Sequence, residues 1–364
     1  MRKNILLKTC CVFAVSAMMT CGVMADEAAV ESKLDLVENI KATATVEDLG
    51  QVTESIEITV TDIAALGELQ EGCFTVNGSS EGVSFETADN VISLTCPGTV
   101  IDASMTVECT GAELLFTGTD INEIDNLSVA DFESLSYEAS NGTTVNYRLK
   151  RGTAEGQPLV LFFHGAGECG TDNNAQIVGN RGAVAWAEYT DEAYIMAPQF
   201  PEKYSTPYEE GQEEYVAGII DAVNELVQGM IEDGTVDGNR IYLTGISMGG
   251  GVAWEFVTRY PELFAGVVTF AARGTVSEVV GNMEVLEKCA ATPVWMYHAA
   301  GDIVNSTMNS LDIYKKLVEL GNENVHMTIY DAAGIEMYQY FCHFSWVPGL
   351  NDSVMMDWLF SQTK

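Results

Sequence analysis

The sequence predicts two domains in succession: a small all-β sandwich and then a three-layer α/β sandwich with a mostly parallel sheet. Two observations lead to this prediction. Short segments with period-two alternation of apolar and polar residues run from about residue 54 to 116. From about residue 137 to the C-terminus, apolar strand patterns instead alternate with helical patterns. We therefore expect a β domain over residues 26–130 and an α/β domain over residues 131–364.

The chain begins with a segment that does not belong to either domain. Three basic residues precede an apolar stretch at 11–24, and Ala25 then offers a small side chain to a signal peptidase. This pattern predicts a signal peptide over residues 1–25 and a secreted protein. Lipid attachment at Cys21 is the less favoured alternative, because the residues before it fit a lipidation site poorly. No later stretch is long and apolar enough to predict a stable membrane span.

The charge of the chain excludes several classes of partner. The formal net charge is −36, from 53 acidic against 17 basic residues. A surface this acidic repels nucleic acid and anionic membranes at long range. We therefore expect no nucleic-acid partner.

The cysteines suggest neither a metal site nor a definite disulfide pattern. Nine are present in all, and those that follow the predicted signal peptide are Cys73, Cys96, Cys109, Cys169, Cys289 and Cys342. Their spacing matches no metal site, so no metal or other cofactor is expected. Each domain holds an odd number of them, and the sequence leaves their pairing open.

The β domain is predicted from alternation and turn residues. Ile56, Ile58 and Val60 alternate with Glu57 and Thr59, as a strand with one buried face requires. Further strands are expected at 74–76, 91–95, 105–109 and 114–117. Turn pairs separate them at Asn77-Gly78, Pro97-Gly98 and Thr110-Gly111.

The α/β domain is predicted from its alternating periods. It opens with a hairpin at 137–150 around Asn141-Gly142. Apolar runs typical of strands buried on both faces follow at 159–163, 240–244, 267–270, 294–298 and 325–330. Helical spacing is found at 216–230, around 254–257, at 311–320 and at 353–361.

One short motif carries a specific chemistry. Gly245-Ile246-Ser247-Met248-Gly249 lies directly after a predicted strand and before a predicted helix. A strand–turn–helix with this G-x-S-x-G pattern exposes its serine on a tight turn and directs the next backbone N–H at a developing oxyanion. The motif predicts Ser247 as a nucleophile and Met248 as one oxyanion donor.

The base follows by elimination among four histidines. His164 belongs to the loop expected to give the second oxyanion N–H, His298 ends a strand and shapes a loop, and His326 lies within a strand. His343 follows the last predicted strand, and we expect it to be the base.

The acid has two candidates. Asp302 and Asp331 each follow a predicted strand, where a carboxylate can orient a histidine. Asp302 is preferred, and it keeps the chain order serine, acid, histidine.

Five blocks of sequence resemble a known family. The α/β domain is similar to α/β-hydrolase esterases related to polyhydroxybutyrate depolymerases, feruloyl esterases and predicted secreted peptidases. The blocks are FFHGAGECGTDN (162–173), NRGAVAWAE (180–188), IMAPQFP (195–201), DGNRIYLTGISMGGGVAWEFVTRYPELFAGVV (237–268) and FCHFSW (341–346). The resemblance implies Ser247, Asp302 and His343 as the triad, and an oxyanion pocket from Ala166 or Gly167 with Met248. Residues 58–78 also resemble the immunoglobulin-like domain that precedes some secreted bacterial esterases.

The chain departs from this family in two places. Cys169 stands where such esterases often have an arginine, which puts the substrate preference in doubt. Residues 334–342 form a longer segment before the histidine than is usual. An aromatic flap of Tyr338, Tyr340 and Phe341 is expected there.

Together these features predict a secreted serine carboxylic-ester hydrolase that works through an acyl-enzyme. Its substrate is expected to be a small-molecule or polysaccharide-linked ester, and its β domain is a candidate surface for homo-oligomer contacts. A serine peptidase of the prolyl-oligopeptidase type is the alternative enzyme. A catalytically silent secreted binding protein is the alternative outside enzymes.

Overall fold

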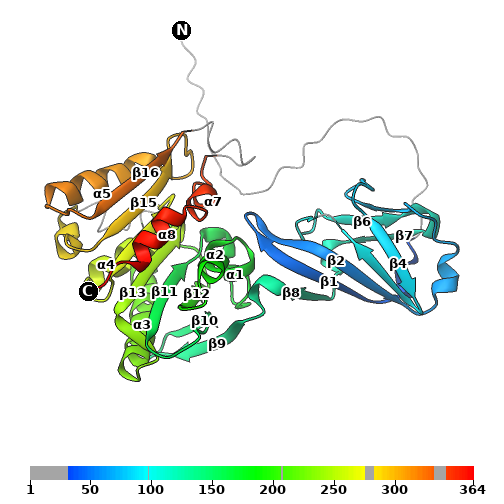
Figure 1. Ribbon diagram of the computed structural model, residues 1–364, viewed down its shortest axis with the longest axis horizontal. Coiled ribbons are helices and arrows are strands. Elements are labelled where there is room, and N and C mark those ends of the chain that lie inside the picture. Colours follow the sequence, from blue (N-terminus) through cyan, green and yellow to red (C-terminus); the bar gives the residue numbers. More distant parts are fainter. Residues whose placement is uncertain (1–31, 97, 206–207, 275–282, 332–341) are drawn as a thin grey trace, which may run out of the picture.

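The computed structural model describes residues 32–96, 98–205, 208–274, 283–331 and 342–364. The predicted signal peptide with Cys21, the Pro97 turn position and the predicted aromatic flap lie outside these residues. An all-β unit and a larger α/β unit lie next to each other along the long axis of the molecule (Figure 1).

The N-terminal unit consists of two sheets. The larger has the order β4-β5-β2-β1-β8 and the smaller the order β3-β6-β7. The strands are β1 (Val37–Glu47), β2 (Gly50–Val60), β3 (Phe74–Val76), β4 (Ser84–Ala88), β5 (Val91–Thr95), β6 (Thr106–Cys109), β7 (Leu114–Thr117) and β8 (Glu123–Asn126). The all-β prediction is confirmed, although the sequence did not identify β1, β4 or β8. In β4 four of the five residues are exposed, so the strand carries little alternation to read.

The inward residues of the two sheets form one apolar core. Ile56, Ile58, Phe74, Val107 and Phe116 belong to it and are almost fully buried. Cys109 belongs to this core and Cys73 packs against it, with their sulfur atoms 2.7 Å apart.

The second unit contains an eight-stranded sheet with the order β16-β15-β14-β13-β11-β12-β10-β9. Its strands are β9 (Phe132–Glu138), β10 (Thr144–Lys150), β11 (Gln157–Phe163), β12 (Tyr194–Gln199), β13 (Val236–Ile246), β14 (Gly266–Phe270), β15 (Val294–Ala299) and β16 (Val325–Tyr330). The pairings from β12 through β11 to β16 are parallel, whereas β9 and β10 are antiparallel. The mostly parallel sheet and the hairpin at 137–150 were both predicted.

Strand β12 was not predicted, and Pro198 explains why. A proline cannot donate to a strand ladder and argues against a central strand. In the structure, the parallel pairing of β12 with β11 ends at Met196, and Pro198 lies opposite Tyr147 of β10. The proline therefore occupies the end of the strand, where it interrupts no bond to β11.

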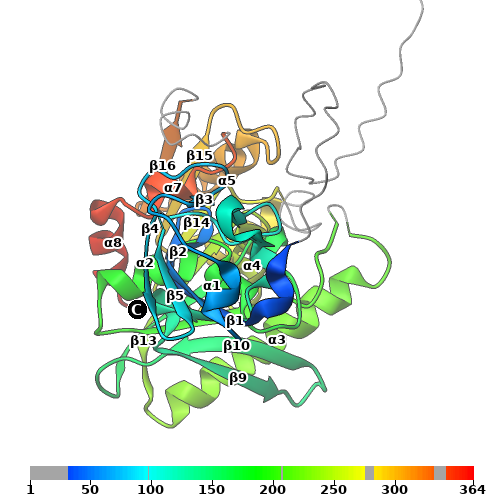
Figure 2. The same cartoon turned by 90° about the vertical axis from the view of Figure 1, so that its right-hand side faces the viewer.

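Helices cover both faces of this sheet (Figures 1 and 2). They are α1 (Ala175–Val178), α2 (Gly182–Tyr189), α3 (Gln212–Glu232), α4 (Met248–Arg259), α5 (Thr307–Glu319), α7 (Trp346–Gly349) and α8 (Ser353–Phe360). Alternate residues of β11 face opposite layers. Leu161 packs in the cluster that includes α3, α4 and α5, whereas Phe162 packs with α1, α2, α7 and α8. This alternation makes the domain a three-layer sandwich.

The two units share buried apolar contacts. Val46 at the end of β1 and Val129 belong to the same cluster as Phe132 and Val178 of the α/β unit. The turn between β1 and β2 also carries Asp48, whose pKa is raised by burial and partly lowered by the nearby Arg181. The β1–β2 hairpin therefore packs on the start of the helical layer formed by α1 and α2 (Figure 1).

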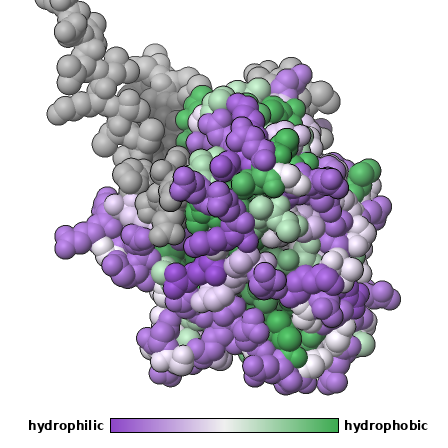
Figure 3. Space-filling model, turned by 90° about the vertical axis from the view of Figure 1, so that its left-hand side faces the viewer, coloured by the Kyte–Doolittle hydropathy of each residue, from purple (hydrophilic) through white to green (hydrophobic). Residues whose placement is uncertain are grey.

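The face drawn in Figure 3 is mainly hydrophilic, with apolar side chains between the polar ones. Within the described ranges, no helix combines the length and the apolar character needed to cross a membrane.

Candidate active site

Ser247 occupies a strained turn between β13 and α4. Its φ is +54° and its ψ −111°, a conformation that side-chain-bearing residues rarely adopt. Backbone bonds hold it in place: its N–H donates to the Phe270 carbonyl at 2.9 Å, and its carbonyl accepts from the Arg273 N–H at 2.8 Å. The serine remains partly exposed, while Ile246 and Met248 on either side are buried.

Glycines allow the backbone segments around this turn to cross closely. A Cβ on Gly245 would lie 2.2 Å from the carbonyl oxygen of Gly249, and a Cβ on Gly249 would lie 2.1 Å from that of Phe163. Both contacts are with backbone, which cannot rotate away. The G-x-S-x-G spacing is therefore a steric requirement of the turn.

Ser247, His343 and Asp302 form one hydrogen-bonded chain. His343 Nε2 lies 3.0 Å from Ser247 Oγ, and His343 Nδ1 lies 2.8 Å from Asp302 Oδ2. Because a carboxylate only accepts, Nδ1 carries the proton and Nε2 presents its lone pair to the serine. The structure thus brings together the three residues that the sequence selected as the triad. His343 itself is buried and packs edge-on against Trp346.

Four donors surround the carboxylate of Asp302. Oδ1 accepts from the N–H groups of Val304 and Asn305 at 2.8 and 2.9 Å. Oδ2 lies 2.8 Å from His343 and 3.2 Å from His298 Nε2. Burial on its own raises the pKa of Asp302, but the hydrogen bonds from His298 and His343 outweigh burial and hold that pKa well below its usual range. The group is therefore a stable carboxylate.

His298 has a closer link to the site than the sequence indicated. Its ring is fully buried, with Nδ1 2.8 Å from Ser310 Oγ and Nε2 3.0 Å from the Asn305 carbonyl. Both partners of Nε2, this carbonyl and Asp302, are acceptors, so Nε2 carries the proton. The sequence predicted only that His298 shapes a loop. The sequence did contain a signal for this contact with Asp302, since His298 ends a predicted strand and precedes Asp302 by four residues.

Asn305 was not selected from the sequence at all. It is buried, and its side-chain amide donates to the Ala271 carbonyl at 2.8 Å and lies 3.4 Å from Ser247 Oγ. Its backbone N–H also binds Asp302. One residue thus connects the serine turn with the loop that carries the acid.

The loop after β11 lies against the serine turn. A Cβ on Gly165 would be 3.8 Å from Ser247 Cβ, and Ala166 and Gly167 follow as exposed residues of a 3₁₀ turn (Ala166–Glu168). Met248 is the first residue of α4, where backbone N–H groups lack helical acceptors. N–H groups from two directions are therefore available close to Ser247.

His164 anchors this loop through hydrogen bonds to the backbone of Gly165 and Phe200. Its Nε2 accepts from the Phe200 N–H at 2.9 Å, and its Nδ1 lies 2.6 Å from the Gly165 carbonyl. Its ring is buried, and burial lowers its pKa, so that it is neutral. This agrees with the structural role expected from the sequence.

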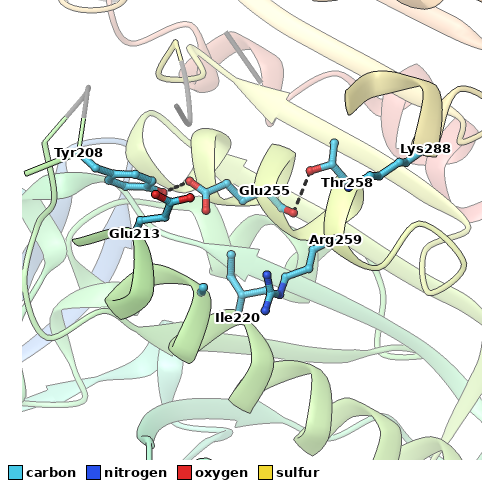
Figure 4. Close-up of a pocket in the computed structure, with 8 residues that line it drawn as sticks. Tyr208, Glu213, Ile220, Glu255, Thr258, Arg259 and Lys288 are labelled. Carbon is cyan, nitrogen blue, oxygen red and sulfur yellow. Dashed lines mark hydrogen bonds between the residues drawn. The ribbon is translucent and has the colours of Figure 1, made fainter. Parts of the chain in front are cut away.

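The other predicted or competing residues lie elsewhere. Asp331 is exposed and directly follows β16, and His326 packs on Trp295 with tilted rings at a centroid distance of 4.8 Å. A pocket between α3 and α4, lined by Tyr208, Glu255 and their neighbours, includes none of the triad residues (Figure 4). Across the described segments, no three histidine, cysteine or acidic residues are grouped to hold a metal ion.

The close backbone crossing generates a stability prediction. Gly249→Ala should lower the free energy of unfolding by more than about 3 kcal/mol, because the added methyl meets the Phe163 carbonyl. Gly251→Ala is the matched control on the same helix, since its Cβ would meet nothing nearer than 3.4 Å. Its effect should stay within about 1 kcal/mol. Urea unfolding measures both variants, and equal stability of the two would contradict the steric argument.

Three comparisons show which known proteins this chain resembles. A family model described as esterase PHB depolymerase matches residues 146–318. A probable carboxylesterase of Oryza sativa subsp. japonica is 26% identical over 164 residues, which cover 41% of this chain and 69% of that protein. The crystal structure of a thermostable esterase superposes with a TM-score of 0.66 at 26% identity, over 90% of this chain and 100% of the other.

The fold, the serine turn and these relatives lead to one conclusion. The similarity to the thermostable esterase includes most of the chain, and the family match lies within the α/β unit. The chain has the α/β-hydrolase fold and is a carboxylic ester hydrolase.

Proposed function

We propose that this hydrolase is a secreted serine esterase in which Ser247 is the nucleophile, His343 the base and Asp302 the acid. The observation that carries the proposal is the chain of two hydrogen bonds, 3.0 and 2.8 Å long, that ends on a strained serine at a strand-to-helix turn. Small-molecule or polysaccharide-linked esters are the proposed substrates.

Acylation uses the proton path of this chain. His343 Nε2 takes the hydroxyl proton as Ser247 Oγ forms a bond to the ester carbonyl carbon. The carbonyl oxygen becomes an oxyanion, which the N–H groups of Met248 and of Ala166 or Gly167 stabilise. The tetrahedral intermediate then expels the alcohol, which receives the proton from His343.

Deacylation repeats the sequence with water as the nucleophile. His343 takes a proton from water, the hydroxide oxygen bonds to the acyl carbon, and Ser247 leaves with the proton returned by His343. Each oxyanion donor contributes roughly 2.7–4 kcal/mol to the barrier reduction in enzymes of this kind.

Asp302 keeps His343 in the tautomer that the reaction needs. As the imidazolium forms, its charge lies 2.8 Å from a carboxylate that four donors already hold ionised. His298 does not contact Ser247 in this mechanism. It is a positioning residue, because its hydrogen bond holds Oδ2 of Asp302 toward His343.

Replacing the nucleophile tests the proposal directly. Ser247→Ala should lower kcat for p-nitrophenyl acetate by at least about 10,000-fold, since no acyl-enzyme can form. It should also abolish covalent labelling by a fluorophosphonate, with unchanged circular dichroism and Tm. Ser361→Ala, an exposed serine at the end of α8, is the control. A folded Ser247→Ala protein with normal turnover would exclude this mechanism. Cleavage of peptide amides in preference to esters by the wild type would favour the peptidase alternative.

Replacing His298 tests the second histidine. His298→Phe keeps a ring but removes the N–H that binds Asp302, so kcat should fall about 10- to 100-fold with little change in KM. The acid limb of the kcat/KM profile should move to higher pH, because a carboxylate with one donor fewer stabilises the His343 imidazolium more strongly.

His326→Phe is the matched control, since His326 lies in the neighbouring strand β16 and packs on Trp295 and Trp358. Equal pH profiles for wild type and His298→Phe would assign His298 a packing role only.

Secretion is the second part of the proposal, and the leader pattern supports it. Export to an oxidising compartment would let Cys73 and Cys109, with sulfurs 2.7 Å apart, form a disulfide. The two thiols would pass two electrons and two protons to an oxidised dithiol oxidoreductase.

That the β domain forms homo-oligomer contacts stays a prediction. The mass of the intact protein in solution tests it.

The exported protein should therefore carry one specific bridge. Peptide mapping without reductant should yield a linked pair containing Cys73 and Cys109, two hydrogens lighter than the separate thiols. Cys96→Ser should leave this pair unchanged, because Cys96 is a separate buried thiol of the same domain. Alkylation of both Cys73 and Cys109 in unreduced, exported protein would contradict the expectation.

A further inference from the structure

Arg273 lies at the same edge of the sheet as the reactive serine. It follows β14 by three residues, and its N–H donates to the Ser247 carbonyl at 2.8 Å. Its Cβ lies 3.4 Å from the position that a Cβ on Gly251 would occupy, one turn into α4. In open α/β sheets, ligands bind beyond the carboxyl ends of the strands, where Arg273 is found.

The guanidinium of Arg273 is held in place, but most of its N–H donors make no hydrogen bond within the described residues. Nη1 donates to the Tyr204 carbonyl, and the guanidinium carbon lies 4.9 Å from the centroid of the Tyr204 ring. Tyr204 is buried and serves as a firm platform. A guanidinium has five N–H donors, and only one of them has a hydrogen-bond partner in the described parts of the chain. No other nitrogen of Arg273 is both sealed from solvent and unsatisfied.

The other described arginines use their charge differently. Four of them form ion pairs with carboxylates: Arg151, Arg181, Arg240 and Arg259. Arg148 forms none, but it makes three hydrogen bonds to backbone carbonyls. Arg273 has neither arrangement, and no ion pair involves it in the described ranges. In a chain with 53 acidic residues, a partly exposed arginine without a carboxylate is unexpected.

The carboxylates of Glu168 and Glu255 act on the neighbours of Arg273, but no ion pair joins either of them to Arg273 in the described ranges. Cys169 of the loop after β11 is close enough for Arg273 and Lys203 to act on it. Burial raises the pKa of the Cys169 thiol to about 12, so the thiol is neutral. Glu255 acts on Tyr204, and its carboxylate also accepts a hydrogen bond from the Tyr208 hydroxyl (Figure 4). Loops after β11, β12 and β14 thus bring a cation, a neutral thiol and a buried ring together beside the serine turn.

We propose that Arg273 forms an anion subsite that binds a carboxylate carried by the ester substrate. A planar guanidinium fixed on an aromatic ring matches a carboxylate with two parallel hydrogen bonds and loses little freedom on binding. The overall charge of −36 repels such a substrate at long range, so a local cation is needed to bind it. The inference rests on the proposed esterase mechanism and narrows its substrates to acidic esters.

The experiment compares matched charged and neutral esters on the full-length enzyme. Mono-p-nitrophenyl adipate is compared with p-nitrophenyl hexanoate, which places the charge on the acyl side. Then 4-acetoxybenzoate is compared with its methyl ester, which places the charge on the alcohol side. The variants are Arg273→Gln and Arg273→Lys. Arg259→Gln is the control, because its guanidinium pairs with Asp221 on the outer surface of the helical layer.

Arg273→Gln should lower kcat/KM for the charged member of one pair about 10- to 100-fold, mainly through KM. The neutral member should change by less than about twofold. Arg273→Lys should retain part of the preference, since it keeps the charge and loses the planar fork. Arg259→Gln should leave both pairs unchanged.

Two results would overturn the subsite. An equal loss on charged and neutral esters, with a lowered Tm, would make Arg273 only a support for the Tyr204 loop. Unchanged kinetics on both pairs would remove any role in binding. Failure of the wild type to cleave the neutral esters would count against the esterase mechanism instead, so the two proposals fail in different ways.

Discussion

The strained backbone at Ser247 is the constraint on which the rest of the site depends. A serine at φ +54° is costly by itself, so the surrounding chain must hold it. β14 holds its N–H, Arg273 holds its carbonyl, and the loop after β11 crosses the first turn of α4 at distances that only glycine permits. The same crossing positions the loop of Ala166 and Gly167 beside the serine. The strain at Ser247, its proposed role as nucleophile and the proposed oxyanion pocket therefore all depend on a single turn.

Most arginines on the surface are paired with opposite charges, whereas the buried charge of the candidate site is stabilised by hydrogen bonds. The surface is strongly acidic, and most of its arginines are neutralised by nearby carboxylates. Inside, the buried carboxylate of Asp302 is stabilised by four hydrogen-bond donors, two of them histidine rings. Low local polarity strengthens these bonds and makes loss of any one of them costly. The unpaired Arg273 stands out against this background.

Much of the fold and the centre of the site could be predicted because the signals are local. The period-two alternation of residues 56–60 and the apolar run at 159–163 identify strands, since the side-chain period belongs to the backbone itself. The glycines around Ser247 identify the turn, because only that spacing avoids backbone clashes. His343 and Asp302 were accessible by chain order, whereas β12 was hidden by a proline that turned out to lie at the end of its pairing.

The sequence by itself determined the order of the all-β and α/β units, the serine turn and the residue types of the proposed triad. Tertiary structure decided which side chains come into contact. The pairs are His343 with Asp302, His298 with Asp302, Asn305 with Ser247, Cys73 with Cys109, and Arg273 with Tyr204. The physical reason is that these contacts depend on how loops from different strands converge at the sheet edge. Strand order and helix packing set that convergence, and no local period or turn motif encodes it.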